Sequence, residues 1–418
     1  MRKIYTSVDL GSDSIKILVA EIYNKKLNVL AVSNVKSSGI KKGLIVDANE
    51  ILVSLREAIS EIEGKLMITI DKVIASVPSY YSTFEIVTGE VDIDEYGKIT
   101  GLDVVKVLQK AVKSKLKMDR ELVTIIPIYY IVDDKKNIKD PKNLIGKKLG
   151  VKAMMATTPS KNVQSIISIF QSLGIDVVDV NLGSIADYNE FKNNTSDTGV
   201  SAVINIGHDI TTVSLFNKGI IINSEVIQIG GKNIDNDISY VFKLDKKDSS
   251  KLKENFAVAH KKFSRVNDVK EAVTTNRDLI SITQYDISQV VMSRLTEILK
   301  LAKKQTYLLT NREISYIIIT GGTAELPGMS YLVEEIFGSN AKVGNIDTIG
   351  IRNNKYSTVS GLIKGINDKL ESRDKEYTMI DLDNDASGQN KLSINDSSVL
   401  NKVFGYFLEV SKSYTSQV

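Results

Sequence analysis

The sequence predicts an α/β fold in which two related lobes face each other across a cleft. The main observation is an internal repeat, because residues 8–13 and 204–209 align without gaps. The aligned pairs are Asp9 with Asn205, Gly11 with Gly207, and Asp13 with Asp209. Each copy has an apolar strand, a polar turn containing glycine and a second apolar strand. A period this long favours duplication of a whole domain over a solenoid.

The elements between and after the two copies support an alternating α/β chain. Further strands are predicted at 27–35, 43–46, 74–77, 125–131 and 220–229, and helices at 104–117 and 161–173. Residues 239–311 have the pattern of a charged, mostly helical insertion, and 316–322 of a buried strand that enters a Gly-Gly turn. From 371 to about 396 the composition is that of a polar linker, and a last apolar segment follows at 399–410.

The composition restricts the chemistry that this chain can perform. Its 418 residues are 42% hydrophobic and 25% charged, which is enough for two to four compact units. The absence of Cys excludes disulfides, thiol catalysis and iron–sulfur clusters. Only two His are present, and the net charge of +3 gives no overall field that would attract nucleic acid. Phosphate binding by backbone amides, carboxylates and hydroxyls fits best.

No targeting segment is predicted. Asp9 is reached before any long apolar run develops, which argues against a signal peptide. No stretch of about 18 uncharged apolar residues occurs, so we expect no membrane-spanning helix and a cytoplasmic body.

The two repeated hairpins have the pattern of phosphate-binding turns. A tight turn directs backbone N–H groups inward, and a carboxylate at the strand end can position a hydrated Mg²⁺. One such turn is usually only a hairpin, whereas two that face each other could hold a phosphate chain. The glycine pairs at 230–231 and 321–322 could let a nucleotide approach the backbone, but plain strand-to-helix turns would use them equally well.

At this point the chain resembles a known family. The two hairpins and the Gly-Gly turn are similar to those of the actin/Hsp70/sugar-kinase superfamily. The order and spacing resemble the FtsA family of actin-like bacterial cell-division proteins. The resemblance rests on residues 9–16 (DLGSDSIK), 77–79 (VPS), 120–127 (RELVTIIP), 140–149 (DPKNLIGKKL) and 230–231 (GG), followed by the linker and apolar tail. It implies a duplicated actin-like (ribonuclease H-like) ATPase fold with a nucleotide cleft and an inserted small α+β subdomain.

The resemblance also implies a division of the chain. Residues 1–80 and 159–197 would form subdomain 1A, and 81–158 the inserted subdomain 1C. Residues 198–234 and 304–370 would form subdomain 2A, and 235–303 subdomain 2B. A flexible linker at 371–396 would lead to an amphipathic membrane-targeting helix at 397–411.

Site residues follow from the resemblance position by position. It implies ATP and Mg²⁺ as ligands, with Asp9 beside the metal and Asn205 reaching it through water. The residues expected to contact the nucleotide come from both hairpins and from the later glycine turns. They are Gly11, Ser12, Lys16, Gly207, Thr211, Gly230, Gly231, Asn233, Lys253, Gly321, Gly322 and Thr323.

The chain departs from the family pattern in the second hairpin. Asn205 stands where Asp is usual, His208 and Asp209 replace two glycines, and Ser250 replaces a ribose-binding Glu. Asn can bind a metal-bound water, but it neither attracts the cation nor takes a proton. We therefore predict nucleotide binding with weak or absent hydrolysis and no confident catalytic residue. His208 could be a catalytic base, although a turn histidine is the favoured interpretation, and His260 is expected at the surface.

The C-terminal segment is predicted to contact a membrane. Its apolar residues follow a helical stripe, while Asn401, Lys402 and Glu409 occupy the other face. A helix docked on its own core would show the same period, but the long polar tether favours an interfacial membrane helix. The stripe consists of Val399, Leu400, Val403, Phe404, Phe407 and Leu408.

The resemblance implies partners and a role. Arg294 is similar to the arginine with which the family receives the C-terminal peptide of the tubulin-like protein FtsZ. The chain would polymerise with itself and anchor the FtsZ ring at the cytoplasmic face of the bacterial membrane, at the division site, together with other division proteins. The alternatives are a superfamily kinase, an Hsp70-like chaperone ATPase and an actin-like pilus-assembly ATPase.

Overall fold

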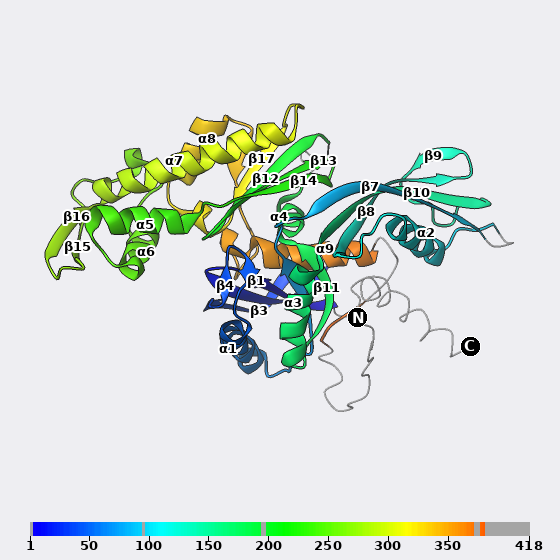
Figure 1. The fold of residues 1–418 in the computed structure, drawn as a ribbon, viewed down its shortest axis with the longest axis horizontal. Coiled ribbons are helices and arrows are strands. Elements are labelled where there is room, and N and C mark those ends of the chain that lie inside the picture. The colour runs from blue at the N-terminus through cyan, green and yellow to red at the C-terminus, as the bar shows by residue number, and fades with distance from the viewer. Residues whose placement is uncertain (1–2, 94–96, 194–197, 372–376, 381–418) are drawn as a thin grey trace.

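The computed structural model describes residues 3–93, 97–193, 198–371 and 377–380, and its centre is formed by two five-stranded sheets. The first sheet, in the lower part of Figure 1, has the order β11-β6-β1-β2-β3. Its strands are β1 (Lys3–Leu10), β2 (Ser14–Tyr23), β3 (Lys26–Lys36), β6 (Lys72–Val77) and β11 (Asp176–Leu182). We call this half of the molecule the first lobe.

The second sheet repeats the first strand by strand, which confirms the predicted duplication. Its order is β14-β13-β12-β17-β18. In both sheets the hairpin strands pair antiparallel, and the two strands on the far side of β1 or β12 run parallel. The strands of this second lobe are β12 (Val200–Ile206), β13 (Thr211–Asn217), β14 (Ile220–Ile227), β17 (Tyr316–Thr320) and β18 (Ala341–Val343).

Helices follow the sheet strands at matching places in the two lobes. Those of the first lobe are α1 (Ala48–Leu66), α3 (Ser160–Ser172) and α4 (Gly183–Phe191). Those at corresponding places in the second lobe are α8 (Met329–Phe337) and α9 (Ser357–Glu371), with short turns η2 (Gly322–Glu325) and η3 (Asn354–Tyr356). Helices α4 and α9 cross so closely that a Cβ on Gly361 would lie 1.7 Å from the Ala186 carbonyl oxygen. This crossing joins the lobes.

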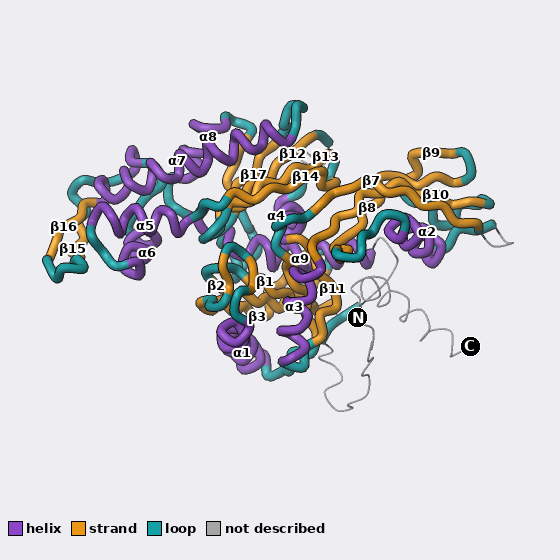
Figure 2. Tube along the Cα trace, in the orientation of Figure 1, coloured by secondary structure: helices purple, strands orange, loops and turns teal. Residues whose placement is uncertain are grey.

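The predicted insertion in the first lobe is a separate α+β subdomain, which extends to the right in Figures 1 and 2. Its sheet has the order β7-β10-β8-β9, and α2 packs against it. Gly89 is required there, because a Cβ would lie 2.6 Å from the Val107 carbonyl oxygen of that helix. The elements are β7 (Thr83–Asp92), α2 (Gly101–Lys113), β8 (Arg120–Val132), β9 (Lys135–Ile138) and β10 (Lys148–Pro159).

The insertion predicted as mostly helical, at 239–311, also contains a β-hairpin that the prediction missed (Figure 2). Its two strands expose most of their side chains, so their hydrophobic pattern is weak. The elements of this region are α5 (Gly231–Phe242), α6 (Lys246–Asn255), η1 (Lys261–Phe263), β15 (Val269–Val273), β16 (Leu279–Thr283) and α7 (Gln284–Leu309).

The predicted flexible linker is wrong in part. Residues 377–380 lie along the start of β1, where the Met379 N–H donates to the Ile4 carbonyl oxygen at 2.8 Å. The Met379 side chain is buried in a cluster with Tyr5 and Leu18, and this burial holds the segment in place. The rest of the linker beyond 380 and the predicted membrane helix at 397–411 lie outside the described residues. Among the described helices, none is both long and apolar enough to cross a membrane.

Candidate nucleotide site between the lobes

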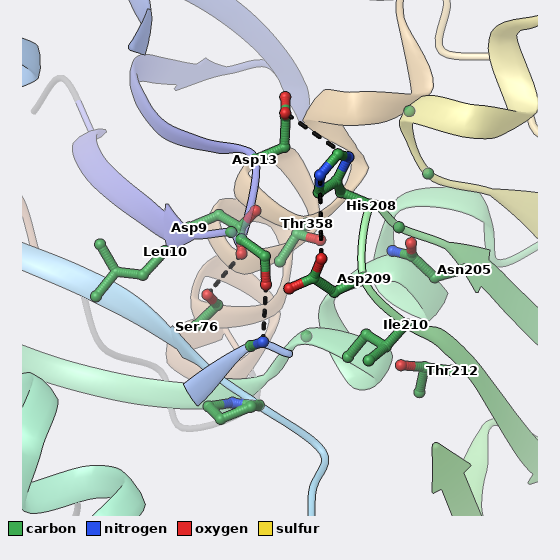
Figure 3. Close-up of a pocket in the computed structure, with 18 of the residues that line it drawn as sticks. Asp9, Leu10, Asp13, Ser76, Asn205, His208, Asp209, Ile210, Thr212 and Thr358 are labelled. Atoms are coloured by element: carbon green, nitrogen blue, oxygen red, sulfur yellow. Dashed lines mark hydrogen bonds and ion pairs between the residues drawn. The ribbon is translucent and has the colours of Figure 1, made fainter. Parts of the chain in front are cut away.

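A cavity of about 840 Å³ lies between the two lobes and is lined by both repeated hairpins (Figure 3). The first hairpin joins β1 to β2, and the second joins β12 to β13. A short hairpin of the first lobe, β4 (Ile40–Lys41) with β5 (Leu44–Ile45), supplies Gly43, Leu44 and Ile45 to the same cavity. The arrangement predicted from the repeat, with two turns on one cleft, is therefore present.

The first hairpin holds an acidic and a basic side chain side by side. Asp9 and Lys16 are cross-strand partners, and Lys16 Nζ lies 3.2 Å from Asp9 Oδ2. Lys16 Nζ also donates to the Ser14 carbonyl oxygen, while Ser76 Oγ donates to Asp9 Oδ1 at 2.7 Å. Gly11 is required in the turn, because a Cβ would lie 2.8 Å from the Ser14 carbonyl oxygen. The result is an ammonium group fixed beside a loop of backbone amides.

The second hairpin carries an amide where the first carries a carboxylate, and a separate carboxylate lies behind it. Asn205 Nδ2 donates to Asp187 Oδ2 at 2.6 Å. Asp187 comes from α4 and is 1% exposed. Its other oxygen accepts from Ser357 Oγ at 2.7 Å and Thr358 Oγ1 at 2.9 Å, at the start of α9. The crossing of α4 and α9 brings these groups together.

Burial and neighbouring charges shift the pKa values of three side chains in the cleft. Burial, with a further contribution from the Asp9 charge, raises the pKa of Asp187 to about 6, although its three hydrogen bonds oppose the shift. Burial lowers the pKa of His208, against the charges of Asp13 and Asp209, so the imidazole is neutral at physiological pH. Burial acts to raise the pKa of Asp13, but the hydrogen bond and charge of Lys36 hold it below its usual range.

The two lobes contact each other directly at the mouth of the cleft. Asp209, one of the two residues that replace a glycine of the family pattern, turns its carboxylate toward the first lobe. There Asp209 Oδ2 accepts the Lys42 backbone N–H at 2.8 Å. The Gly43 N–H in turn donates to Ser12 Oγ at 2.8 Å. His208 lies across from Asp13, with Nδ1 3.8 Å from Oδ1 (Figure 3).

The later glycine turns pack against the second hairpin. A Cβ on Gly230 would lie 2.6 Å from the carbonyl oxygens of Gly207 and His208. Gly321 has a φ of +94°, and its Cβ would lie 2.5 Å from Asn205 Oδ1. Both glycines are thus required by close backbone approach. Gly322 is different, because the nearest neighbour of an added Cβ is Lys355 Cβ at 3.8 Å, which leaves space beside the backbone.

Most of the predicted nucleotide-binding and metal-binding residues line the cavity, and four do not. Those on its wall are Asp9, Gly11, Ser12, Lys16, Asn205, Gly207, Lys253, Gly321, Gly322 and Thr323. Thr211, Gly230, Gly231 and Asn233 are absent from the wall. Thr211 is fully buried and donates to the Ile229 carbonyl oxygen, whereas its neighbour Thr212 lines the cavity. Asn233 Oδ1 accepts the Gly230 N–H as a cap on α5.

Several cavity residues were missed by sequence reasoning. Asp187 is the most buried carboxylate among them, and Glu254, Asn354 and Lys355 also line the cavity. Glu254 lies one helical turn after Ser250, whose hydroxyl donates to it at 3.3 Å. A carboxylate is therefore present near the position where the ribose-binding Glu was missing. The spacing of four residues on a helix could have indicated it.

Two single residues outside the cavity were also predicted. His260 is 8% exposed, so the expectation that it lies on the surface is wrong. Its ring packs against Phe263 and Tyr331, and Nε2 lies 3.3 Å from Glu335 Oε2. Arg294 lies on α7 and is partly exposed. It donates to both carboxylate oxygens of Asp237 on α5, with NH2 2.8 Å from Oδ1, and also to Glu297.

Within the described ranges, no three or more His, Asp or Glu side chains cluster so as to hold a metal alone. Asp9 and Asp187 are nevertheless both on the cavity wall, and the charge of Asp9 acts on Asp187. Mg²⁺ is commonly held by one or two carboxylates together with the phosphates of its substrate, and this pair fits that arrangement.

Comparison with known proteins gives matches to one family in two parts of the chain. A sequence model described as "Cell division protein FtsA" matches residues 202–361, and one described as "SHS2 domain inserted in FTSA" matches residues 81–157. Cell division protein FtsA of Streptococcus pneumoniae is 30% identical over 363 residues, which cover 86% of this chain and 79% of the relative. The Bacillus subtilis protein of the same name is 29% identical and covers 87% and 83%.

Solved structures share the fold at low sequence identity. A chain of the PilM-PilN type IV pilus biogenesis complex has a TM-score of 0.56 at 14% identity and covers 86% of this chain and 97% of its own. MreB5 of Spiroplasma citri bound to ADP has a TM-score of 0.52 at 13% identity and covers 89% and 98%. These similarities establish the duplicated actin-like fold.

Proposed function

This chain belongs to the FtsA family of cell division proteins, and from that premise we propose that it binds ATP and Mg²⁺ between its lobes. In this proposal it polymerises at the cytoplasmic face of the bacterial membrane, at the division site. There it anchors the tubulin-like FtsZ ring through a C-terminal amphipathic helix. The observation that carries the nucleotide part is the pair of hairpin turns on one cavity. Its lining includes the Lys16 ammonium, the carboxylates of Asp9 and Asp187, and the open turn at Gly322.

Each part of a nucleotide has a candidate partner in the cleft. Lys16 and the amides around Gly11 and Ser12 would hold the phosphates, because an ammonium and turn N–H groups both favour anions. Gly322 leaves room for a flat base or ribose beside the backbone. A neighbour of known fold, MreB5, was solved bound to ADP, which supports the choice of ligand class.

The same cleft offers groups that suit a hydrated Mg²⁺. Asp9 would face the ion directly or through water, and the Asn205 oxygen would accept from a metal-bound water. When bound, Mg²⁺ would neutralise phosphate charge. Neutral His208 lies in the second turn, and no hydrogen bond joins it to a described carboxylate that could orient it as a base. We therefore keep the prediction that hydrolysis is weak or absent.

Membrane attachment is inferred from the sequence of residues 397–411. The stripe that includes Val403, Phe404 and Phe407 would insert between headgroups and acyl chains, while Asn401 and Lys402 face water. One short helix binds weakly, but a polymer that presents many such helices gains avidity. Polymerisation and attachment would thus reinforce each other.

The surface around Arg294 is proposed as the site for the FtsZ C-terminal peptide. Arg294 on α7 donates to Asp237 on α5 and so links the two helices. Tyr240 and Val241, which follow Asp237 along α5, are exposed. A guanidinium with exposed apolar neighbours suits a peptide that carries both acidic and apolar side chains. The peptide would compete with Asp237 and Glu297 for the guanidinium.

Co-sedimentation with liposomes that contain anionic lipid tests the membrane and assembly parts together. The wild type should pellet with the liposomes, more strongly with ATP, and should carry the FtsZ tail peptide with it. Electron microscopy of the pellet should show filaments.

A matched pair of variants tests the apolar stripe specifically. Phe404→Asp places a charge on the stripe and should abolish most liposome binding, whereas Asn401→Asp adds the same charge on the polar face and should retain it. Equal binding by both variants would refute the amphipathic helix as the membrane contact.

A further inference from the structure

Asp187 is a buried carboxylate whose hydrogen-bond donors are all neutral. An asparagine amide and two hydroxyls surround it, and the side chain is 1% exposed. Burying a charge is costly unless a cation is close. Asparagine has the same shape and could make the same contacts, because the Ser357 and Thr358 hydroxyls can rotate to accept. The packing of α4 and α9 therefore gives no reason for a charge at this position.

The partner of Asp187 is the residue that departs from the family pattern. Only the NH₂ group of Asn205 can donate to a carboxylate, so the bond to Asp187 fixes which way the amide faces. Asn205 Oδ1 consequently points toward Gly321, which lines the cavity. Asn205, which also lines the cavity, thus has its acceptor oxygen beside Gly321, with the negative charge one side chain further back on Asp187.

We propose that Asp187 is a positioning residue for the divalent cation of a bound nucleotide. Acting through Asn205, it supplies the negative charge that position 205 lacks, and it holds the Asn205 oxygen toward the hydration shell of the cation. The proposal rests on the proposed binding of ATP and Mg²⁺ in this cleft. In this arrangement two carboxylates act on the cation: Asp9 of the first lobe, and Asp187, which lies behind the second hairpin.

The position of Asp9 supports this assignment. Both carboxylates line one cavity, and their charges interact. Lys16 pairs with Asp9, whereas the hydrogen bonds that reach Asp187 come from neutral groups. A divalent cation between the two hairpins would relieve the repulsion between the carboxylates. Residues that hydrogen-bond to a metal-binding side chain, and so orient it, commonly affect the affinity for the metal.

The test compares ATP binding with Mg²⁺ and with EDTA by isothermal titration calorimetry. In the wild type, Mg²⁺ should tighten ATP binding. In Asp187→Asn, the affinity with Mg²⁺ should fall by about 10- to 100-fold, the usual range for loss of such a partner. The affinity in EDTA should stay close to that of the wild type, because the contacts to the nucleotide itself are unchanged.

A charge-swapped variant separates positioning from a structural role. Asp187→Asn combined with Asn205→Asp moves the carboxylate from α4 to the strand of the second hairpin and keeps the hydrogen-bonded pair. It should restore most of the Mg²⁺ effect that Asp187→Asn loses. A purely structural role would give no such rescue, since the swapped pair changes two residues of this contact instead of one.

The outcomes are distinguishable. Equal enhancement by Mg²⁺ in wild type and Asp187→Asn would overturn the inference while leaving nucleotide binding intact. A swapped variant no better than the single variant, or an Asp187→Asn protein that fails to fold, would also overturn it. A wild type that binds no ATP in either buffer would contradict the proposed function of the cleft and this inference together.

Discussion

Four side chains determine the chemistry of the cleft: Asp9, Lys16, Asn205 and Asp187. On the first hairpin the charges of Asp9 and Lys16 are paired, which keeps the lysine extended beside the turn. On the second hairpin the strand residue at this position is an amide, Asn205. The carboxylate bonded to it, Asp187, lies on α4. The site therefore has Asp9 on the first hairpin and Asp187 behind the second, in addition to Asp13 and Asp209 in the hairpin turns.

The buried charge of Asp187 predicts a pH-dependent stability. Because the folded-state pKa is raised to about 6 from 3.8, the unfolded chain ionises first as pH rises. The wild type should lose stability between about pH 4 and 6 and regain it on acidification. Asp187→Asn lacks this loss, so the ligand-free variant should be the more stable protein at pH 7, by at most about 3 kcal/mol.

Urea denaturation of the ligand-free wild type and Asp187→Asn at pH 4.5 and pH 7 checks this prediction. The difference between the two proteins should be small at the lower pH and should grow toward neutrality. A variant that is less stable than the wild type at pH 7 would mean that the charge is needed for folding.

Sequence reasoning reached some of these residues and missed others for a physical reason. The repeat identified Asp9 and Asn205, and the family resemblance identified Lys16, because all three lie on hairpins whose turn follows directly along the chain. Asp187 was not found, because its contact with Asn205 depends on how α4 lies against β12. His260 was misplaced in the same way, since its burial comes from packing against Tyr331 on α8.

At the scale of elements, the β4–β5 hairpin connects the two lobes. It lies between Ser12 of the first turn and Asp209 of the second, and its own backbone N–H groups bond to both. Opening of the cleft would break the bond from Lys42 to Asp209. The residue that replaces a family glycine thus serves as a contact between the lobes and also lines the cavity.

Loss of this contact should speed nucleotide release. Asp209→Ala removes a hydrogen bond to a charged acceptor, worth roughly 1.5 kcal/mol, which corresponds to about a tenfold faster dissociation. Stopped-flow displacement of a fluorescent ATP analogue measures the rate. Asp248→Ala, which removes an exposed carboxylate on α6, is the control and should leave the rate unchanged. Equal rates in both variants would show that the Asp209 contact does not limit opening.

The predicted elements were most accurate where burial gives a regular pattern. Most strands of both sheets and α3 were expected close to where they lie, because their apolar residues face a core, whereas β11 and β18 were not predicted. The segment at 377–380 was assigned to a linker, since its neighbours are polar, whereas burial of Met379 and the hydrogen bond between Thr378 and Ile4 hold it against β1. The β15–β16 hairpin was missed because it buries little, and so its sequence resembles that of exposed helices.

At the scale of the whole molecule, the duplication explains the position of the site. Because the two sheets have the same strand order, their first hairpins occupy equivalent positions. The lobes meet at the α4–α9 crossing, and both hairpins line one cavity. A repeat of three aligned pairs was enough to predict this plan. The surfaces used for assembly could not be predicted as securely, because exposed residues carry no periodic signal.

The most direct test of the central claim is equilibrium binding of ATP to the full chain with Mg²⁺. The wild type should bind one ATP per chain, and Lys16→Ala should weaken the affinity at least tenfold, because it removes the cation beside the phosphate turn. Lys110→Ala, an exposed lysine on α2, should bind as the wild type does. Failure of the wild type to bind ATP, or equal affinity in the wild type and Lys16→Ala, would contradict a nucleotide site between the lobes.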